Sequence, residues 1–197
     1  MILGITGGSG TGKSSACAYF RDRNFVIIDA DMVAREVCNA GTECLGELVQ
    51  YFGNEIVDAS GNLMRKKLGS IVFADADKLR VLNKITHKHI IKRIKELADV
   101  SKNSDLVIDA PLLLETGLDD ICDATLFVSS TKEKRILRIV ARDCLSEEEA
   151  KNRIGSQKDD NYYKERCDYT VTNNGTEAEL MDKLDKIFGG EYGSQKK

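Results

Sequence analysis

A glycine-rich segment near the start of the chain has the residue types and spacing of a loop that binds phosphate groups. Residues 7–14, GGSGTGKS, match the pattern GxxxxGK[ST] and lie between a short apolar run and a stretch of helical composition. Glycines allow successive backbone N–H groups to face one anion, and the start of the following helix adds about half a positive charge. A flexible glycine turn would need neither the lysine nor the serine. We therefore predict that the chain binds a nucleoside triphosphate.

The residues of this segment contribute through both side chains and backbone. Lys13 can reach the β- and γ-phosphates, and the Ser14 hydroxyl can coordinate Mg²⁺. The other ATP contacts predicted here lie along the loop and at the start of the helix: Gly8, Gly10, Thr11, Gly12 and Ser15. The loop alone leaves open whether the triphosphate is hydrolysed, transferred or only sensed.

Three aspartates lie at the ends of the next two apolar runs. Asp29 and Asp31 come at the end of one run, and Asp109 ends the other. In open parallel sheets the ligand lies beyond the C-terminal ends of the strands, so we expect these acids to face the phosphates. We assign Asp31 and Asp109 to function, as proton acceptor or Mg²⁺ ligand, and Asp29 to capping the next helix. The sequence lacks an NKxD segment that would recognise guanine, which favours a small-molecule kinase over a GTPase.

The distribution of apolar runs predicts an α/β fold. Five short runs rich in Val and Ile alternate with longer stretches of helical periodicity: residues 2–6, 25–29, 106–109, 125–128 and 169–172. This alternation is typical of a buried parallel sheet with crossover helices. We predict a P-loop kinase-type core, in which a parallel sheet of about five strands is flanked by helices.

The spacing of the runs predicts two insertions. About 75 residues separate the second and third runs, which is far more than one crossover helix needs. Helical periodicity over residues 43–52, 63–73 and 78–98 predicts a helical insertion there, and residues 131–153 form a second, charge-rich one. We predict one domain over residues 1–190 and a flexible tail over 191–197.

Composition excludes several classes of protein. The 197 residues are 42% hydrophobic and 31% charged, which is too apolar for intrinsic disorder. Lys and Arg (29) do not outnumber Asp and Glu (32), so we expect no nucleic-acid partner. No apolar run approaches the ~20 residues that cross a bilayer, and the N-terminus lacks the basic start of a signal peptide, so we expect a cytoplasmic protein without a membrane partner. The six cysteines contain no CxxC pair and are expected to be reduced thiols rather than zinc ligands.

Five segments together resemble the dephospho-CoA kinase family. In chain order they are LGITGGSGTGKS, VIIDADMVAREV, APLLLE, RILRIVARD with RIGSQ, and CDYTVTNNG. The second and third segments are more specific than the phosphate loop, which many families share. The resemblance implies transfer of the γ-phosphoryl group of ATP to the ribose 3′-hydroxyl of dephospho-CoA, the last step of coenzyme A synthesis. It also implies a helical CoA-binding region at about 36–100 and a lid at about 131–160.

The resemblance also implies roles for single residues. Asp31 corresponds to the proposed catalytic base, which orients the ribose hydroxyl and accepts its proton. Asn173 corresponds to an asparagine near the adenine. The residues implied in binding the acceptor substrate are Thr6, Leu112 and Glu115.

Three arginines of the second insertion share one helix face. Arg135, Arg138 and Arg142 are spaced i, i+3 and i+7, so a helix would present them as a stripe. A solvated charged face is the common explanation for such a stripe, whereas arginines near a phosphate loop could stabilise a transferring phosphoryl group. The resemblance favours function for Arg138, as a catalytic residue, and for Arg142, while Arg135 stays open. Residues 146–149, SEEE, predict a capping box at the start of the next helix.

The two histidines form an HxH pattern, which in a helix turns their side chains about 200° apart and argues against joint metal binding. We predict a surface position for His89. His87 could pack or contact substrate, because Lys88 follows it where the family usually has proline. Tyr162 and Tyr163 are predicted to pack in the interior.

Two other functions stay open from the residues alone. Another P-loop small-molecule kinase, such as a nucleoside or nucleotide monophosphate kinase, would have the same phosphate loop. An ATP-dependent switch would also have it, but would not need an acid facing a ribose. The expected small-molecule partners are ATP and dephospho-CoA, and the sequence fits a monomer or a homo-oligomer.

Overall fold

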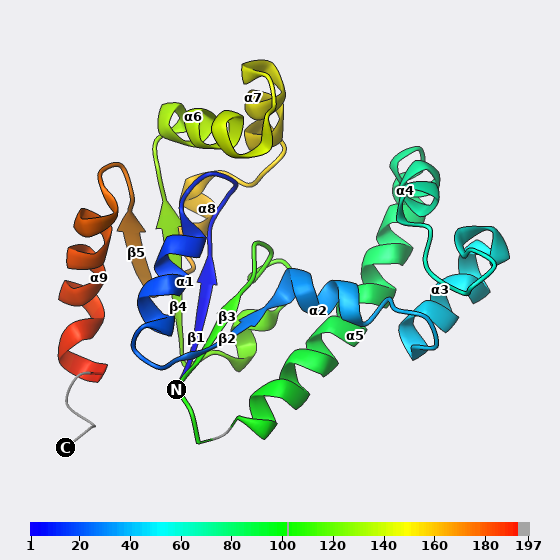
Figure 1. Cartoon of the computed structure of the whole chain (residues 1–197), viewed down its shortest axis with the longest axis horizontal. Helices are drawn as coiled ribbons and strands as arrows, with labels where there is room; N and C mark the ends of the chain where they lie inside the picture. The colour runs from blue at the N-terminus through cyan, green and yellow to red at the C-terminus, as the bar shows by residue number, and fades with distance from the viewer. Residues whose placement is uncertain (102, 193–197) are drawn as a thin grey trace. The chain divides into compact units, whose positions relative to one another are not determined.

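The computed structural model describes residues 1–101 and 103–192. Within it the chain forms two compact units, which Figure 1 shows along the coloured chain. One unit comprises residues 1–27 together with the chain from residue 101 onward, and the other comprises residues 28–100. The second unit corresponds closely to the insertion predicted between the second and third apolar runs.

A five-stranded parallel sheet is the framework of the fold, as predicted. Its strands are β1 (Ile2–Thr6), β2 (Val26–Asp29), β3 (Leu106–Asp109), β4 (Ala124–Ser129) and β5 (Tyr169–Thr172), in the order β2-β3-β1-β4-β5. The central strands β1, β3 and β4 are buried along nearly their whole length, which explains their continuous apolar sequences. Each predicted run agrees with its strand to within one residue at either end.

Helices α1 (Lys13–Arg21) and α9 (Glu177–Tyr192) pack on each other and on this sheet. An aromatic cluster joins them: Phe20 meets Phe25 and Phe188 edge to face, with ring centroids 5.2 Å apart in both pairs. Helix α9 includes residues 191 and 192, the first two of the predicted flexible tail. The remaining residues of that tail, 193–197, lie outside the described residues.

The unit of residues 28–100 is helical, as predicted. It contains α2 (Ala30–Glu36), α3 (Glu43–Phe52), the 3₁₀ turn η1 (Asn54–Ile56), α4 (Arg65–Phe73) and the long α5 (Ala76–Val100). Helix α5 contacts α2, α3 and α4 and so forms the axis of this unit. The predicted bounds of its three longer helices agree with the structure to within two residues.

Two local predictions about helix starts are confirmed. The Asp29 carboxylate accepts hydrogen bonds from the backbone N–H groups of Asp31 (2.8 Å) and Met32 (3.1 Å), so it caps α2. Ser146 and Glu149 form the reciprocal capping box that starts α7 (Glu147–Gly155). This helix packs against α6 (Lys132–Asp143), and together they make the second predicted insertion.

The predicted surface position of His89 is wrong. Its side chain is only 6% exposed, and its Nε2 lies 3.1 Å from Glu47 Oε1 of α3. It is buried in α5 as Ile94 and Ala98 are, but it points to a different side of the helix, since spacings of five and nine residues do not share a face. Helix periodicity therefore did not mark His89 as buried.

The remaining elements are α8 (Asp160–Lys164) and the 3₁₀ turn η2 (Leu118–Ile121). All six cysteines are free thiols, as expected. Over residues 1–101 and 103–192, the structure contains no helix long and apolar enough to span a bilayer.

The aromatic cluster around Phe20 is expected to contribute strongly to the free energy of unfolding. We expect Phe20→Ala to lower the free energy of unfolding by about 3–5 kcal/mol, because Phe20 is 1% exposed and truncation leaves a cavity. The control is Phe73→Ala, which removes the same group from a side chain 84% exposed and should change stability by no more than about 0.5 kcal/mol. Urea unfolding of both variants measures the difference, and equal losses would contradict this account of the core.

Candidate active site

The phosphate loop, residues 7–14, connects β1 to α1. Gly10 (φ 77°) and Gly12 (φ 95°) adopt the left-handed conformation, which explains glycine at both positions. Gly12 is also the cap residue of α1, and no side chain caps that helix. The first N–H groups of a helix have no partner inside it. The N–H groups of α1 that precede Ser15 can therefore face an anion, as a phosphate site requires.

Each backbone carbonyl group of residues 8–12 accepts a hydrogen bond. Inside the loop, Gly8 O accepts from Thr11 Oγ1 (2.9 Å), and Gly12 O accepts from the backbone N–H groups of Ser15 (3.1 Å) and Ala16 (3.2 Å). The carbonyl groups of residues 9, 10 and 11 accept from side chains far away in the sequence, namely Arg135, Arg138 and Asn173. The carbonyl groups of the loop are thus hydrogen-bonded within the protein.

Lys13 and Asp109 form an ion pair, with 2.7 Å between Nζ and Oδ1 and less than a fifth of either side chain exposed. The sheet dictates this meeting, because β1 and β3 are adjacent and Ile5 pairs with Asp109 in the register. Beside them the Cys17 thiol is buried. Its pKa is raised above the usual range, first by burial and then by the Asp109 carboxylate, so it is a neutral group.

The residues at this pair fit a magnesium ion. Ser14 is exposed in the first turn of α1, next to Lys13, and Asp109 supplies a carboxylate. A hydroxyl and a carboxylate are hard oxygen donors of the kind that Mg²⁺ takes together with substrate phosphates. Across the described residues there is no group of three or more His, Cys, Asp or Glu side chains that could hold a metal ion.

The predicted catalytic residue Arg138 and the predicted ATP-binding residue Asn173 meet on the carbonyl side of the loop. Arg138 Nη1 donates to Gly10 O (3.2 Å), and its Nη2 donates to Asn173 Oδ1 (3.4 Å). Asn173 Nδ2 in turn donates to Thr11 O (2.9 Å). The arginine bonds are long, whereas the asparagine bond has ordinary length. Arg138 Nη1 also donates to Thr11 O (3.4 Å) and Ser130 Oγ (3.2 Å), so its guanidinium has several hydrogen bonds that are each longer than that of Asn173.

Arg142 takes a different position from Arg138, although both were assigned to the lid. Its side chain is 61% exposed and forms two hydrogen bonds, of 2.7 and 2.9 Å, with the neighbouring Asp143. The pKa of Asp143 is lowered to about 2, chiefly by this hydrogen bond from Arg142. The structure does not bring Arg142 to the loop cluster of Arg138 and Asn173.

A cavity of about 430 Å³ lies next to the loop. Its lining includes two residues that the resemblance implies in acceptor binding, Leu112 and Glu115. Gly8 of the loop and Tyr163 of α8 also line it. Further lining residues are Pro111, Ser156, Gln157 and Lys158.

The Glu115 carboxylate, in the wall of this cavity, has a hydrogen-bond partner for only one of its two oxygens among the described residues. Its Oε1 accepts a hydrogen bond of 2.9 Å from Tyr163 Oη. Its Oε2 is buried and has no hydrogen-bond partner among the described residues. Tyr163, which stacks on Phe127, is buried as predicted, and burial raises the pKa of its hydroxyl. A buried carboxylate oxygen without a donor is costly, so this wall is suited to a ligand that brings one.

The other substrate residues implied by the resemblance take varied positions. Thr6 is fully buried and donates to Pro111 O (3.1 Å), so it can act on a ligand only by holding the turn after β3. Asp31 lies in the first turn of α2, within the unit of residues 28–100. His87 is half-buried in α5 of the same unit, and burial lowers its pKa.

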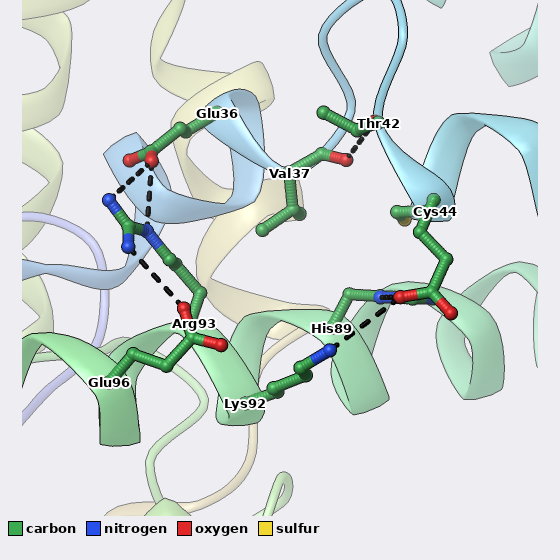
Figure 2. Close-up of a pocket in the computed structure, with 9 residues that line it drawn as sticks. Glu36, Val37, Thr42, Cys44, His89, Lys92, Arg93 and Glu96 are labelled. Atoms are coloured by element: carbon green, nitrogen blue, oxygen red, sulfur yellow. Dashed lines mark hydrogen bonds and ion pairs between the residues drawn. The ribbon is translucent and has the colours of Figure 1, made fainter.

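The helical unit contains a pocket of its own, of about 180 Å³, between α2, α3 and α5. Charged side chains in it already pair with one another: Figure 2 shows Arg93 with Glu36 and Glu96. Lys92 pairs with Glu43. The three carboxylates outnumber the two basic side chains by one, and every charged side chain of the pocket has an ion-pair partner.

The sequence analysis did not single out Gln157 and did not assign Arg135. Both contact the phosphate loop in the structure, although more than 120 positions separate them from it in the chain. Gln157 is the last residue of the RIGSQ segment, and its position in a segment that resembles the family was the sequence feature that could have pointed to it.

Comparisons with known proteins identify the family of this chain. A model of the dephospho-CoA kinase family matches residues 1–179. A dephospho-CoA kinase of Enterococcus faecalis is 38% identical over 196 residues, covering 98% of both chains. One of Fusobacterium nucleatum is 36% identical over 187 residues, covering 95% of this chain and 96% of the relative.

Solved structures show the same fold. A Thermus thermophilus protein has a TM-score of 0.81 at 28% identity, covering 97% of both chains. The dephospho-CoA kinase of Campylobacter jejuni has a TM-score of 0.73 at 25% identity, covering 98% of this chain and 97% of that one. A shikimate kinase of Acinetobacter baumannii, at 14% identity and a TM-score of 0.53, shares the fold alone. By its family model and its relatives, this chain belongs to the dephospho-CoA kinase family.

Proposed function

We propose that this protein transfers the γ-phosphoryl group of ATP to the ribose 3′-hydroxyl of dephospho-CoA, which yields ADP and coenzyme A. The observation that carries the proposal is the phosphate loop with its Lys13–Asp109 ion pair, in a member of this family. A lysine held beside an open helix N-terminus is suited to the β- and γ-phosphates of a triphosphate.

ATP binds in this proposal along the loop. The backbone N–H groups at the start of α1 and the Lys13 ammonium contact the phosphates, and Asp109 keeps the ammonium in place before ATP arrives. Ser14 and Asp109 would hold Mg²⁺, which neutralises charge on the β- and γ-phosphates when it is bound. Asn173, fixed on Thr11 O, borders the adenine end of the nucleotide.

Asp31 is the proposed base for the acceptor hydroxyl. It follows directly on the capping residue Asp29 and Ala30, so its backbone is fixed at the start of α2. A carboxylate there would orient the ribose hydroxyl and accept its proton as the bond to phosphorus forms. The unit of residues 28–100 then carries the acceptor side of the reaction, with His87 among its substrate contacts.

Glu115 and Leu112 are the proposed contacts to the acceptor in the cavity beside the loop. The buried Oε2 of Glu115 needs a hydrogen-bond donor, and hydroxyl and amino groups of dephospho-CoA can supply one. Tyr163 holds the other oxygen and so keeps the carboxylate oriented. Leu112, which is half exposed at the cavity, offers apolar contact.

The arginines of α6 are proposed to act when the lid closes. Arg138 would exchange its long bonds to loop carbonyl groups for the transferring phosphoryl group, whose charge a guanidinium matches well. Arg142 would leave Asp143 to reach the nucleotide. Closure only with both substrates present would keep water from acting as the acceptor. We also propose a cytoplasmic location for this reaction.

Asp31→Asn tests the base. We expect ADP release in the presence of dephospho-CoA to fall by about 10²–10⁴-fold, because the amide cannot accept the hydroxyl proton, while ATP binding is retained. The matched control is Asp29→Asn, since asparagine can cap α2 as aspartate does and leaves activity near wild type. A coupled ADP-release assay with and without dephospho-CoA measures both. Acceptor stimulation that survives in Asp31→Asn would remove Asp31 from this role, and a wild-type preference for a nucleoside monophosphate would reject the proposed acceptor.

Arg138→Ala tests the lid. We expect kcat to fall by about 10²–10³-fold and the Kd for ATP to change far less, because the guanidinium acts mainly on charge that develops in the transition state. Arg166→Ala serves as control, since Arg166 is exposed and stacks on Tyr162. Steady-state kinetics and titration with ATP separate the two effects. Equal losses in kcat and in ATP affinity would count against a transition-state role for Arg138, and a loss of ATP affinity with kcat unchanged would show that it only binds ATP.

A further inference from the structure

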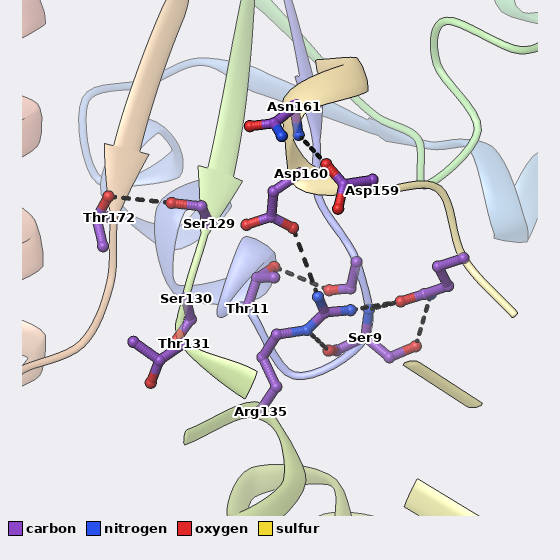
Figure 3. Close-up of polar contacts among 12 residues, drawn as sticks. Ser9, Thr11, Ser129, Ser130, Thr131, Arg135, Asp159, Asp160, Asn161 and Thr172 are labelled. Carbon is purple, nitrogen blue, oxygen red and sulfur yellow. Dashed lines mark hydrogen bonds and ion pairs between the residues drawn. The ribbon is translucent and has the colours of Figure 1, made fainter. Parts of the chain in front are cut away.

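Arg135 is buried at the base of the lid, where the sequence left its role open. Only 7% of its side chain is exposed, which is unusual for arginine. Its Nε donates to Ser9 O (2.9 Å), its Nη2 donates to Gln157 Oε1 (2.5 Å), and its Nη1 lies 3.6 Å from Asp160 Oδ1. Figure 3 shows the guanidinium between the loop and the segment that leads into α8. A guanidinium is costly to bury unless it is paired and hydrogen-bonded, and here it is both.

Gln157 holds the same loop residue from a second direction. Its Oε1 accepts from the Ser9 backbone N–H (3.1 Å), and its Nε2 donates to Ser9 Oγ (3.1 Å). Two donors, from Ser9 and Arg135, converge on Oε1, so the orientation of the amide follows from its partners. The backbone N–H, the carbonyl and the hydroxyl of Ser9 are therefore all bound by these two side chains.

The glycines on either side of Ser9 allow this approach. A Cβ atom on Gly8 would collide with Arg135 Nη2 and lie 2.6 Å from Gln157 Oε1. A Cβ atom on Gly10 would lie 2.7 Å from the backbone oxygen of Arg135. Close contact between the loop and residues 135 and 157 is thus part of the reason for glycine at these positions.

We propose that Arg135 and Gln157 form a clamp that positions the phosphate loop for the triphosphate. A loop with several glycines loses much conformational freedom when it binds a ligand. Fixing Ser9 before ATP arrives removes part of that cost and lets the loop's N–H groups bind phosphate without rearranging. Arg135 is thus a positioning residue rather than a catalytic one. The inference rests on the proposed function only in taking the loop as the site of the ATP phosphates.

The clamp also joins both ends of the lid to the loop. Arg135 lies in the first turn of α6, and Gln157 follows the end of α7. The start and the end of the α6–α7 insertion therefore both contact Ser9. Asp160, the first residue of α8, completes the set by facing Arg135. The base of the lid therefore stays anchored to the loop, whatever the helices beyond it do.

Arg135→Met tests the clamp, because methionine retains length and helix propensity but donates no hydrogen bond. We expect affinities for ATP and ADP to fall roughly tenfold or more, the order expected for a lost charge-assisted hydrogen bond, while affinity for adenosine changes less than about twofold. KM for ATP should rise with kcat nearly unchanged, and Arg135→Lys should recover part of the loss. Competition against a fluorescent ATP analogue gives the three affinities.

Two further variants complete the test. Lys134→Met is the matched control, since it removes one positive charge from the adjacent, exposed position of α6 and should leave all three affinities unchanged. Gln157→Leu acts on Ser9 from the other side and should also weaken ATP and ADP selectively. The double variant should lose less than the sum of the two single losses. Gln157→Leu carries the test alone if Arg135→Met does not fold.

Two outcomes would overturn the clamp. One is unchanged ATP affinity in both Arg135→Met and Gln157→Leu. The other is equal loss of affinity for ATP, ADP and adenosine together with a lower Tm, which would indicate a merely structural role. Wild-type ADP release that dephospho-CoA does not stimulate would instead reject the proposed acceptor, and the phosphate-selective losses would still support the clamp.

Discussion

Backbone carbonyl groups of the phosphate loop need donors of their own if its N–H groups are to stay available to an anion. In residues 8–12 every carbonyl has one, from the loop itself, from Arg135 and Arg138 of α6, or from Asn173 after β5. An unpaired buried carbonyl would cost free energy and favour a flipped peptide, which would turn an N–H group away from the site. The loop geometry therefore depends on residues from the C-terminal half of the chain.

The sheet provides the second half of the site by the order of its strands. Because β3 lies beside β1, the carboxylate at the end of β3 meets the lysine that follows the loop, 96 positions earlier in the chain. The pair neutralises two partly buried charges. It also places an oxygen donor and an ammonium on the same side of the sheet, which a triphosphate with its metal ion would need.

Much of this architecture could be predicted from the sequence, and the reasons are local. The strands β1, β3 and β4 are buried on both faces and so appear as unbroken apolar runs, and Ser146 with Glu149 marks a helix start through a pattern only four residues long. The predictions that failed or stayed open depend on contacts between distant residues. His89 is buried because Glu47 of α3 faces it, and Arg135 because Ser9 and Gln157 surround it.

Helix α6 illustrates why a shared helix face does not imply a shared environment. Its three arginines fall on one stripe, yet Arg135 is buried, Arg138 donates hydrogen bonds to carbonyl groups of the loop and Arg142 is exposed beside Asp143. The stripe thus leads from Arg135 and Arg138, which contact the loop, to Arg142, which pairs with Asp143 at the end of α6. Asp143 also pairs with Arg153, so this end of α6 is tied to α7.

The glycines of the loop are required for two reasons, their backbone conformation and their lack of a side chain. Their left-handed backbone, at Gly10 and Gly12, is what brings N–H groups toward an anion. Their missing side chains are what admit Arg135, Gln157 and Asn173, because a Cβ atom on Gly8, Gly10 or Gly12 would meet one of these residues. A substitution that tolerated the backbone conformation would still displace the donors that hold the carbonyl groups. The positions of the glycines in residues 7–12 therefore reflect the close packing of Arg135, Gln157 and Asn173 as well as the binding of phosphate.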